Sequence, residues 1–186
     1  ALCAVLILVP GFSSLSATFA SSNDDKIVIG TSNFTEVIIL GYMYTDLIES
    51  NTDIKVDQKF NLNGGSFCFD ALNNDSIDMF VEYTGTALSD MLHEPIENDP
   101  DTVYNKVKDL MMERHNIHVS EPLGFNNTYV MSVKSELAEK YNLKTLSDLM
   151  KVSDQLKLGC TVEFVQREDC LPLLEKTFNS KFKSVS

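Results

Sequence analysis

Residues 26–50 read KIVIGTSNFTEVIILGYMYTDLIES, and this stretch decides the fold class. The β-branched run at its start predicts a strand, and the apolar-rich segment that begins near Phe34 predicts a helix. Ser32 or Asn33 is expected to cap this helix, with Glu36 at capping-box distance from Asn33. A strand that leads through a short polar loop into a helix is the repeating unit of an α/β protein.

The alternation of strand and helix patterns continues along the rest of the chain. Further strands are expected at 54–62, 77–85, 117–120 and 156–160. Further helices are expected at 66–74, 86–92, 101–115, 135–141, 145–152 and 171–178. Strands that alternate with helices form mainly parallel sheets, whose faces the helices cover. We therefore expect an α/β fold.

Composition and charge exclude several classes of protein. The chain has 186 residues, of which 44% are hydrophobic, and this content argues against wholesale disorder. A net charge of -12 would repel phosphate backbones, so nucleic-acid binding is not expected. Residues 1–120 carry 6 basic and 18 acidic side chains, whereas residues 121–186 carry 9 of each. This change near residue 121 predicts a second lobe from there on.

The first twelve residues, ALCAVLILVPGF, form an almost wholly apolar run. The run is shorter than the roughly 20 residues of a membrane-spanning helix, but it suits the apolar region of a signal peptide or the end of a spanning helix. Thr18 and Ala20 offer a small-x-small cleavage pattern. A lipid anchor on Cys3 is a further alternative, although lipobox cysteines follow the apolar run. Residues 1–25 are expected to be a signal peptide or membrane-helix remnant plus a linker.

Cysteine and histidine spacing predicts neither a metal site nor a cofactor. Cys68, Cys160 and Cys170 form no CxxC pair, and His115 and His118 make an HxxH with no partner pair nearby. Cys160 and Cys170 are expected either to pair in an exported protein or to be free, half-buried thiols. The chain has no GxSxG, Walker loop or HExxH, and a hydrolase using Cys68 or Cys160 would need an activating histidine. No enzyme is expected.

Candidate binding residues lie in the loops that follow the expected strands, because ligands of open parallel sheets bind beyond the carboxyl ends of the strands. The loops are 31–36, 82–86, 126–129 and 163–169. Tyr83 and Tyr129 offer aromatic faces that suit a quaternary ammonium, and Arg167 suits a carboxylate. Each also fits an ordinary role: a tyrosine at a strand end packs at the core edge, and Arg167 has Glu163, Glu168 and Asp169 close by for an ion pair.

Taken together, these segments resemble the substrate-binding component of glycine betaine/carnitine/choline (osmoprotectant) ABC transporters. The resemblance is carried by residues 26–49, 77–88, 122–133, 136–149 and 158–169. It implies a periplasmic-binding-protein type II fold of two α/β lobes joined by a hinge, truncated here in the second lobe. Residues 26–121 would form the first lobe and 122–186 the hinge and part of the second, with the remaining cage aromatics of the family beyond residue 186.

The resemblance also implies a binding site. The expected ligand-binding residues are Tyr83, Thr86, Tyr129, Arg167, Ser32 and Asn33. The tyrosines would form part of an aromatic cage around the ammonium, Thr86 would hold the polar end of the ligand, and Arg167 would bind a carboxylate. Ser32 stands where many relatives have lysine, which leaves a choline-like ligand open. Cys170 stands where relatives usually have glycine, which calls a tight turn there into question.

The implied function is capture of a quaternary ammonium osmoprotectant (glycine betaine, choline or carnitine) outside the cytoplasm and its delivery to an ABC permease powered by a separate ATPase. The protein would sit at the outer face of the cytoplasmic membrane or in the periplasm, free, anchored or fused to a permease. Two alternatives stay open: a binding protein for an amino acid or another small polar solute, and the ligand-binding domain of a sensor.

Overall fold

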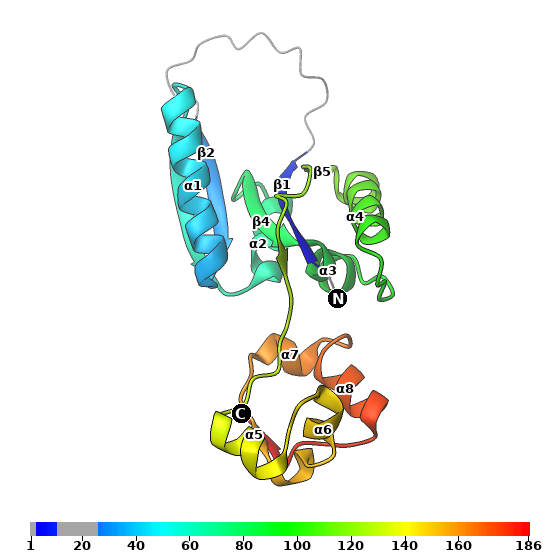
Figure 1. Ribbon diagram of the computed structural model, residues 1–186. Helices are drawn as coiled ribbons and strands as arrows, with labels where there is room; N and C mark the ends of the chain where they lie inside the picture. The colour runs from blue at the N-terminus through cyan, green and yellow to red at the C-terminus, as the bar shows by residue number, and fades with distance from the viewer. Residues whose placement is uncertain (1–2, 11–25) are drawn as a thin grey trace. The chain divides into compact units, whose positions relative to one another are not determined.

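The computed structural model describes residues 3–10 and 26–186 (Figure 1). The expected α/β fold is confirmed, since strands and helices alternate through the described chain. The chain divides into two compact units, Ala1–Thr128 and Tyr129–Ser186. The sequence places the start of the second lobe at residue 122, and the division in the structure falls after Thr128.

The first unit is built on a sheet of six strands among the described residues, with the order β3-β2-β4-β1-β5 and with β6 also paired to β1. The strands are β1 (Cys3–Pro10), β2 (Lys26–Ser32), β3 (Lys55–Leu62), β4 (Met79–Tyr83), β5 (Ile117–Val119) and β6 (Asn126–Asn127). β2 runs parallel to both β3 and β4, as expected for strands joined by helices. β1 runs antiparallel to β4, β5 and β6.

Strand β1 comes from the apolar run at the start of the sequence. It lies between β4 and β5, where Val5 is paired with Tyr83 and Leu8 with Val119. A segment rich in Val, Ile and Leu suits an interior strand. The cleavage pattern at Thr18 and Ala20 lies outside the described residues, and the signal or anchor role of the run stays a prediction. Within 3–10 and 26–186, no helix combines the length and the apolar character needed to cross a membrane.

The helices of the first unit are α1 (Thr35–Asn51), α2 (Gly65–Asn73), α3 (Thr84–Thr86) and α4 (Pro100–His115), with a π-helical turn at Ala87–Met91. Helix α4, expected at 101–115, begins at Pro100, and the Asp99 side chain caps it by accepting a hydrogen bond from the Thr102 amide at 2.8 Å. It ends at Asn116, which has the left-handed conformation typical of a helix C-terminus.

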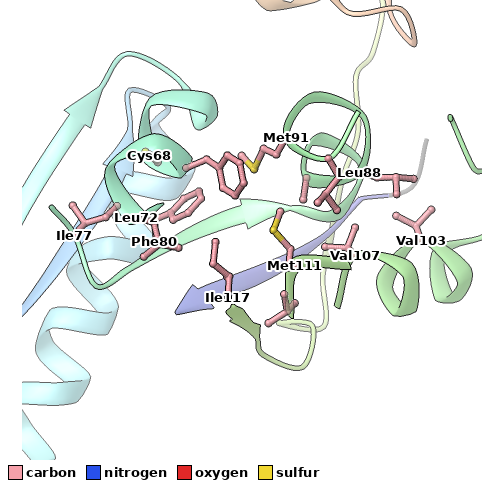
Figure 2. Packing of buried hydrophobic residues seen from close by; sticks show 14 residues of the cluster. Cys68, Leu72, Ile77, Phe80, Leu88, Met91, Val103, Val107, Met111 and Ile117 are labelled. Carbon is pink, nitrogen blue, oxygen red and sulfur yellow. The ribbon is translucent and has the colours of Figure 1, made fainter. Parts of the chain in front are cut away.

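The main core of the first unit lies between the sheet and α2, the π-helical turn and α4. Figure 2 shows Phe80 of β4 and Ile117 of β5 among side chains of α2, the π-helical turn and α4. Phe80, Ile117, Leu72, Leu88 and Met111 are each at most 2% exposed. Full burial of a side chain of this size stabilises a fold by roughly 1.5 to 3 kcal/mol, so this cluster helps to hold β4 in place.

The second unit is smaller and mainly helical. Its helices are α5 (Ser135–Tyr141), α6 (Leu146–Met150), α7 (Val162–Gln166) and α8 (Leu171–Phe178), and a 3-10 turn spans Ser153–Gln155. Two short parallel strands, β7 (Lys157–Leu158) and β8 (Ser184–Val185), form its sheet. Phe164, Cys170 and Leu171 form its buried cluster and connect α7 to α8.

Candidate functional site

The loops after β2 and β4 meet at one edge of the first unit's sheet. The two strands are parallel neighbours, with Ile29 paired to Met79 and Gly30 to Phe80, so their carboxyl ends point the same way. Ser32, the last residue of β2, is buried, and Asn33 after it is exposed. Segments 31–36 and 82–86 therefore lie close together in the first unit.

Tyr83 ends β4 and is held by a carboxylate from helix α1. Its hydroxyl donates a hydrogen bond to Glu36 Oε1 at 2.8 Å, and Asn127 Nδ2 also donates to Glu36 Oε1, at 3.0 Å. Burial, then the hydrogen bond to Glu36 and its negative charge, raise the pKa of Tyr83 well above its ordinary value. The ring therefore carries a protonated, oriented hydroxyl at neutral pH.

The position of Glu36 corrects one sequence expectation. Helix α1 begins at Thr35, its N-cap residue is Phe34, and no side chain caps it. The capping box of Asn33 and Glu36 is thus wrong, because the Glu36 carboxylate reaches Tyr83 and Asn127 instead of its own helix terminus. Ser32 belongs to β2 and is likewise not the cap.

A second carboxylate, Glu82, lies beside Tyr83 and is only 4% exposed. Its Oε1 accepts a hydrogen bond from the Tyr83 amide at 2.8 Å. A Cβ atom at Gly65, the first residue of α2, would collide with the Glu82 carboxylate, so Gly65 gives this side chain its space. Burial, with a smaller contribution from Glu82, raises the pKa of Cys68 to about 12. Cys68 is therefore a protonated thiol and a poor nucleophile.

Thr86 lies at the end of the short helix α3, three residues after Tyr83, and is half-buried. It is packed at the same edge of the sheet as Tyr83, because α3 follows β4 directly. The sequence pattern correctly places Tyr83 at the end of a strand, but it misses Glu36 and Glu82 as hydrogen-bond partners of the tyrosine. An acidic residue four positions after Ser32 signals only a helix start, and nothing local shows that it reaches a strand 47 residues away.

In the second unit, Tyr129 stands beside Phe164 and Arg167. The ring centroids of Tyr129 and Phe164 are 5.1 Å apart with tilted planes, and the Arg167 guanidinium carbon lies 5.9 Å from the Tyr129 centroid. Tyr129 is 53% exposed, so much of its surface is open to solvent. Phe164 of α7, which the sequence pattern does not single out, packs against the Tyr129 ring.

Arg167 makes a two-point ion pair with Asp169. Nε donates to Oδ1 at 2.9 Å and Nη2 donates to Oδ2 at 2.7 Å, and both side chains are only 8% exposed. Burial alone would raise the pKa of Asp169, but the Arg167 hydrogen bond and charge hold it below its ordinary value. The ion pair that the sequence offers as the ordinary role of Arg167 is thus present, and it neutralises the cation proposed to bind a carboxylate.

The cysteines show no metal or disulfide chemistry in the described residues. Cys68, Cys160 and Cys170 form no disulfide with one another, and Cys160 packs against the cluster that contains Cys170. No group of three potential metal-binding side chains occurs within 3–10 and 26–186. Cys170 has a φ of -113°, so the position needs no glycine-type conformation, and the expected difficulty of the turn does not arise.

Known proteins resemble the chain along most of its length. The family model for the substrate-binding domain of ABC-type glycine betaine transport systems matches residues 25–185. The carnitine transport binding protein OpuCC of Listeria monocytogenes is 34% identical over 166 residues, which cover 88% of this chain and 54% of that protein. The glycine betaine-binding protein YehZ of Escherichia coli strain K12 is 29% identical over 163 residues, covering 83% of this chain and 52% of that protein. The chain thus spans about half the length of these two relatives.

A third relative combines two functions in its name. The ergothioneine transport permease/ergothioneine binding protein EgtU of Helicobacter pylori strain G27 is 32% identical over 163 residues, covering 87% of this chain and 29% of that protein. Among solved structures, the crystal structure of a glycine betaine/carnitine/choline ABC transporter protein matches with a TM-score of 0.65 and 29% identity. That match covers 88% of this chain and 60% of the solved one.

Proposed function

Because the chain belongs to the substrate-binding domains of ABC-type glycine betaine transport systems, we propose that the protein binds a quaternary ammonium osmoprotectant outside the cytoplasm and delivers it to an ABC permease. The relatives named for carnitine and glycine betaine binding support this choice of ligand class. Transport would depend on a separate ATPase. The protein would act by binding and release, without catalysis.

The arrangement of Tyr83 carries the proposal. A trimethylammonium group is attracted to the face of an aromatic ring by about 0.5 to 2 kcal/mol, more when the site is dry. Tyr83 is half-buried at the carboxyl end of β4. Its hydroxyl donates a hydrogen bond to the Glu36 carboxylate, and its backbone amide donates one to the Glu82 carboxylate. Their negative charge adds to the attraction of the ring for a cation.

We further propose that Tyr129 supplies an aromatic face from the second unit. Its ring is ordered by Phe164 and remains half exposed, which suits contact with a ligand. Ser32, Asn33 and Thr86 would supply hydrogen bonds to the polar part of the ligand, since they lie at or just after the carboxyl ends of β2 and β4.

The ion pair of Arg167 bears on the choice among ligands. A guanidinium already bound at two points by Asp169 has less to offer a ligand carboxylate than an unpaired one. The carboxylates at Tyr83 also repel an anionic group. We therefore place choline, which has no carboxylate, ahead of glycine betaine and carnitine. The proposed ligand is therefore a cation, which both the tyrosine faces and the carboxylates of Glu36 and Glu82 help to select.

Titration calorimetry of the protein that contains these 186 residues tests the proposal, with choline, glycine betaine, carnitine and a panel of amino acids as ligands. We expect binding of the quaternary ammonium compounds and none of the amino acids. Binding of amino acids alone would support the solute-binding alternative and contradict the proposal. A sensor would be distinguished by a genomic neighbourhood without a permease and an ATPase.

A further inference from the structure

We propose that Glu36 is a positioning residue, which orients the aromatic face of Tyr83 and ties it to the segment that leads into the second unit. The inference rests on the proposed function in one respect, because the importance of the Tyr83 face depends on a cationic ligand. The contacts themselves lie wholly within the first unit and can be tested without any ligand.

Three segments far apart in the sequence meet at one oxygen atom. Glu36 lies in the first turn of α1, Tyr83 ends β4, and Asn127 ends β6. Glu36 Oε1 accepts from the Tyr83 hydroxyl at 2.8 Å and from Asn127 Nδ2 at 3.0 Å. The separations along the chain are 47 and 91 residues, so this oxygen joins elements that lie far apart in the sequence.

A carboxylate is well suited to this position. As an acceptor-only group it receives both donors without competing for a proton, and hydrogen bonds to a charged acceptor are stronger than neutral ones. A phenol that donates to a carboxylate is also polarised, which increases the negative charge over its ring. Glu36 would therefore both fix the direction of the Tyr83 ring and strengthen its attraction for a cation.

The Asn127 contact extends this role to the connection between the units. Asn127 is followed by Thr128, the last residue of the first unit, and then by Tyr129. Within the described residues β6 pairs with β1 at Cys3–Asn127 and Ala4–Asn126, and the Glu36 contact adds a side-chain attachment of this segment to α1. Loss of Glu36 would remove this attachment together with the one that holds the Tyr83 hydroxyl.

The first test compares a cation with its uncharged isostere. Choline and 3,3-dimethylbutan-1-ol, in which carbon replaces the nitrogen, are titrated into the wild-type protein, Glu36→Gln and Asp46→Asn. Asp46 is an exposed residue of the same helix, so its variant controls for the loss of one negative charge. We expect Glu36→Gln to weaken choline about tenfold, as expected for a lost charge-assisted contact, and to weaken the neutral isostere much less. Equal losses for both compounds, or no loss, would overturn the role of the charge.

The second test needs no ligand. Urea unfolding is measured for Glu36→Gln, Tyr83→Phe and the double variant. Tyr83→Phe keeps the ring and removes only the hydroxyl that Glu36 accepts. We expect the double variant to lose clearly less than the sum of the single variants, because both remove the same contact. Strict additivity would overturn the contact. If the wild-type protein binds no quaternary ammonium, the proposed function fails, while this cycle still decides whether Glu36 positions Tyr83.

Discussion

Arg167 and Asp169 bind each other at two points, with nitrogen-to-oxygen distances of 2.9 Å and 2.7 Å. Each of the two side chains is only 8% exposed. The pair stands next to Tyr129, whose ring centroid is 5.9 Å from the guanidinium carbon. Because the positive charge of Arg167 is balanced by Asp169, the net charge of the pair beside the Tyr129 ring is close to zero.

Removal of the Asp169 charge should shift the preference among ligands. In Asp169→Asn the guanidinium loses its charged partner, so we expect the affinity for glycine betaine to rise relative to choline by about tenfold. Titration calorimetry with both ligands measures the ratio. Glu168→Gln, which changes the neighbouring exposed residue by the same charge, should leave the ratio unchanged. An unchanged ratio in Asp169→Asn would mean that Arg167 does not meet the ligand.

The same pair should make stability depend on pH. The pKa of Asp169 is lower in the folded protein than its ordinary value of about 3.9 in an unfolded chain. Its contribution is therefore fully present above that ordinary value and is lost as the pH falls through the folded pKa. We expect urea midpoints of the wild-type protein and Asp169→Asn to differ most near pH 7 and to converge in acid. A gap that stays constant to pH 2.5 would contradict this.

The tyrosine faces should matter more than the tyrosine hydroxyls. Tyr83→Ala and Tyr129→Ala remove aromatic faces, and we expect each to lose most of the affinity for quaternary ammonium compounds. Tyr83→Phe keeps the ring and gives up the hydrogen bond to Glu36, so a smaller loss is expected. Calorimetry with choline measures all three variants. Wild-type affinity for choline in both Tyr83→Ala and Tyr129→Ala would contradict the proposed role of the aromatic faces.

The space at Gly65 should contribute to the stability of the first unit. A methyl group there would press on the buried Glu82 carboxylate, and overpacking of this kind costs about 1 to 3 kcal/mol. Urea unfolding of Gly65→Ala measures this cost. Gly159→Ala is the matched control, because a Cβ atom at Gly159 meets nothing within 4 Å. Similar stabilities of the two variants would show that Glu82 moves away freely.

The thiol of Cys68 should be inert in the folded protein. It is fully buried, and burial together with the Glu82 charge raises its pKa to about 12. We expect an alkylating reagent at pH 8 to modify Cys160 first, since Cys160 is partly exposed, and to reach Cys68 only after unfolding in urea. Mass spectrometry of the labelled peptides distinguishes the sites. Rapid labelling of native Cys68 would reopen the question of a thiol nucleophile.

Local patterns in the sequence predict several elements well. The β-branched run at 26–30 lies within β2, and the helix expected at 101–115 is α4, capped by Asp99. Tyr83 is found correctly at a strand end. These features follow from backbone preferences, side-chain periodicity and contacts between near neighbours, all of which act over a few residues. In the second unit, the helices expected at 135–141 and 171–178 coincide with α5 and α8.

By itself, then, the sequence determined the α/β alternation, the helix expected at 101–115 and the position of Tyr83 at the end of a strand. Only the tertiary structure decided that Glu36 reaches Tyr83 and Asn127, and that Arg167 pairs with Asp169 at two points. It also decided that the apolar run Cys3–Pro10 is an antiparallel strand beside β4. The physical reason is that hydrogen bonds and ion pairs are chosen by direction and burial in the folded chain, and a separation of 47 or 91 residues leaves no local pattern that could reveal them.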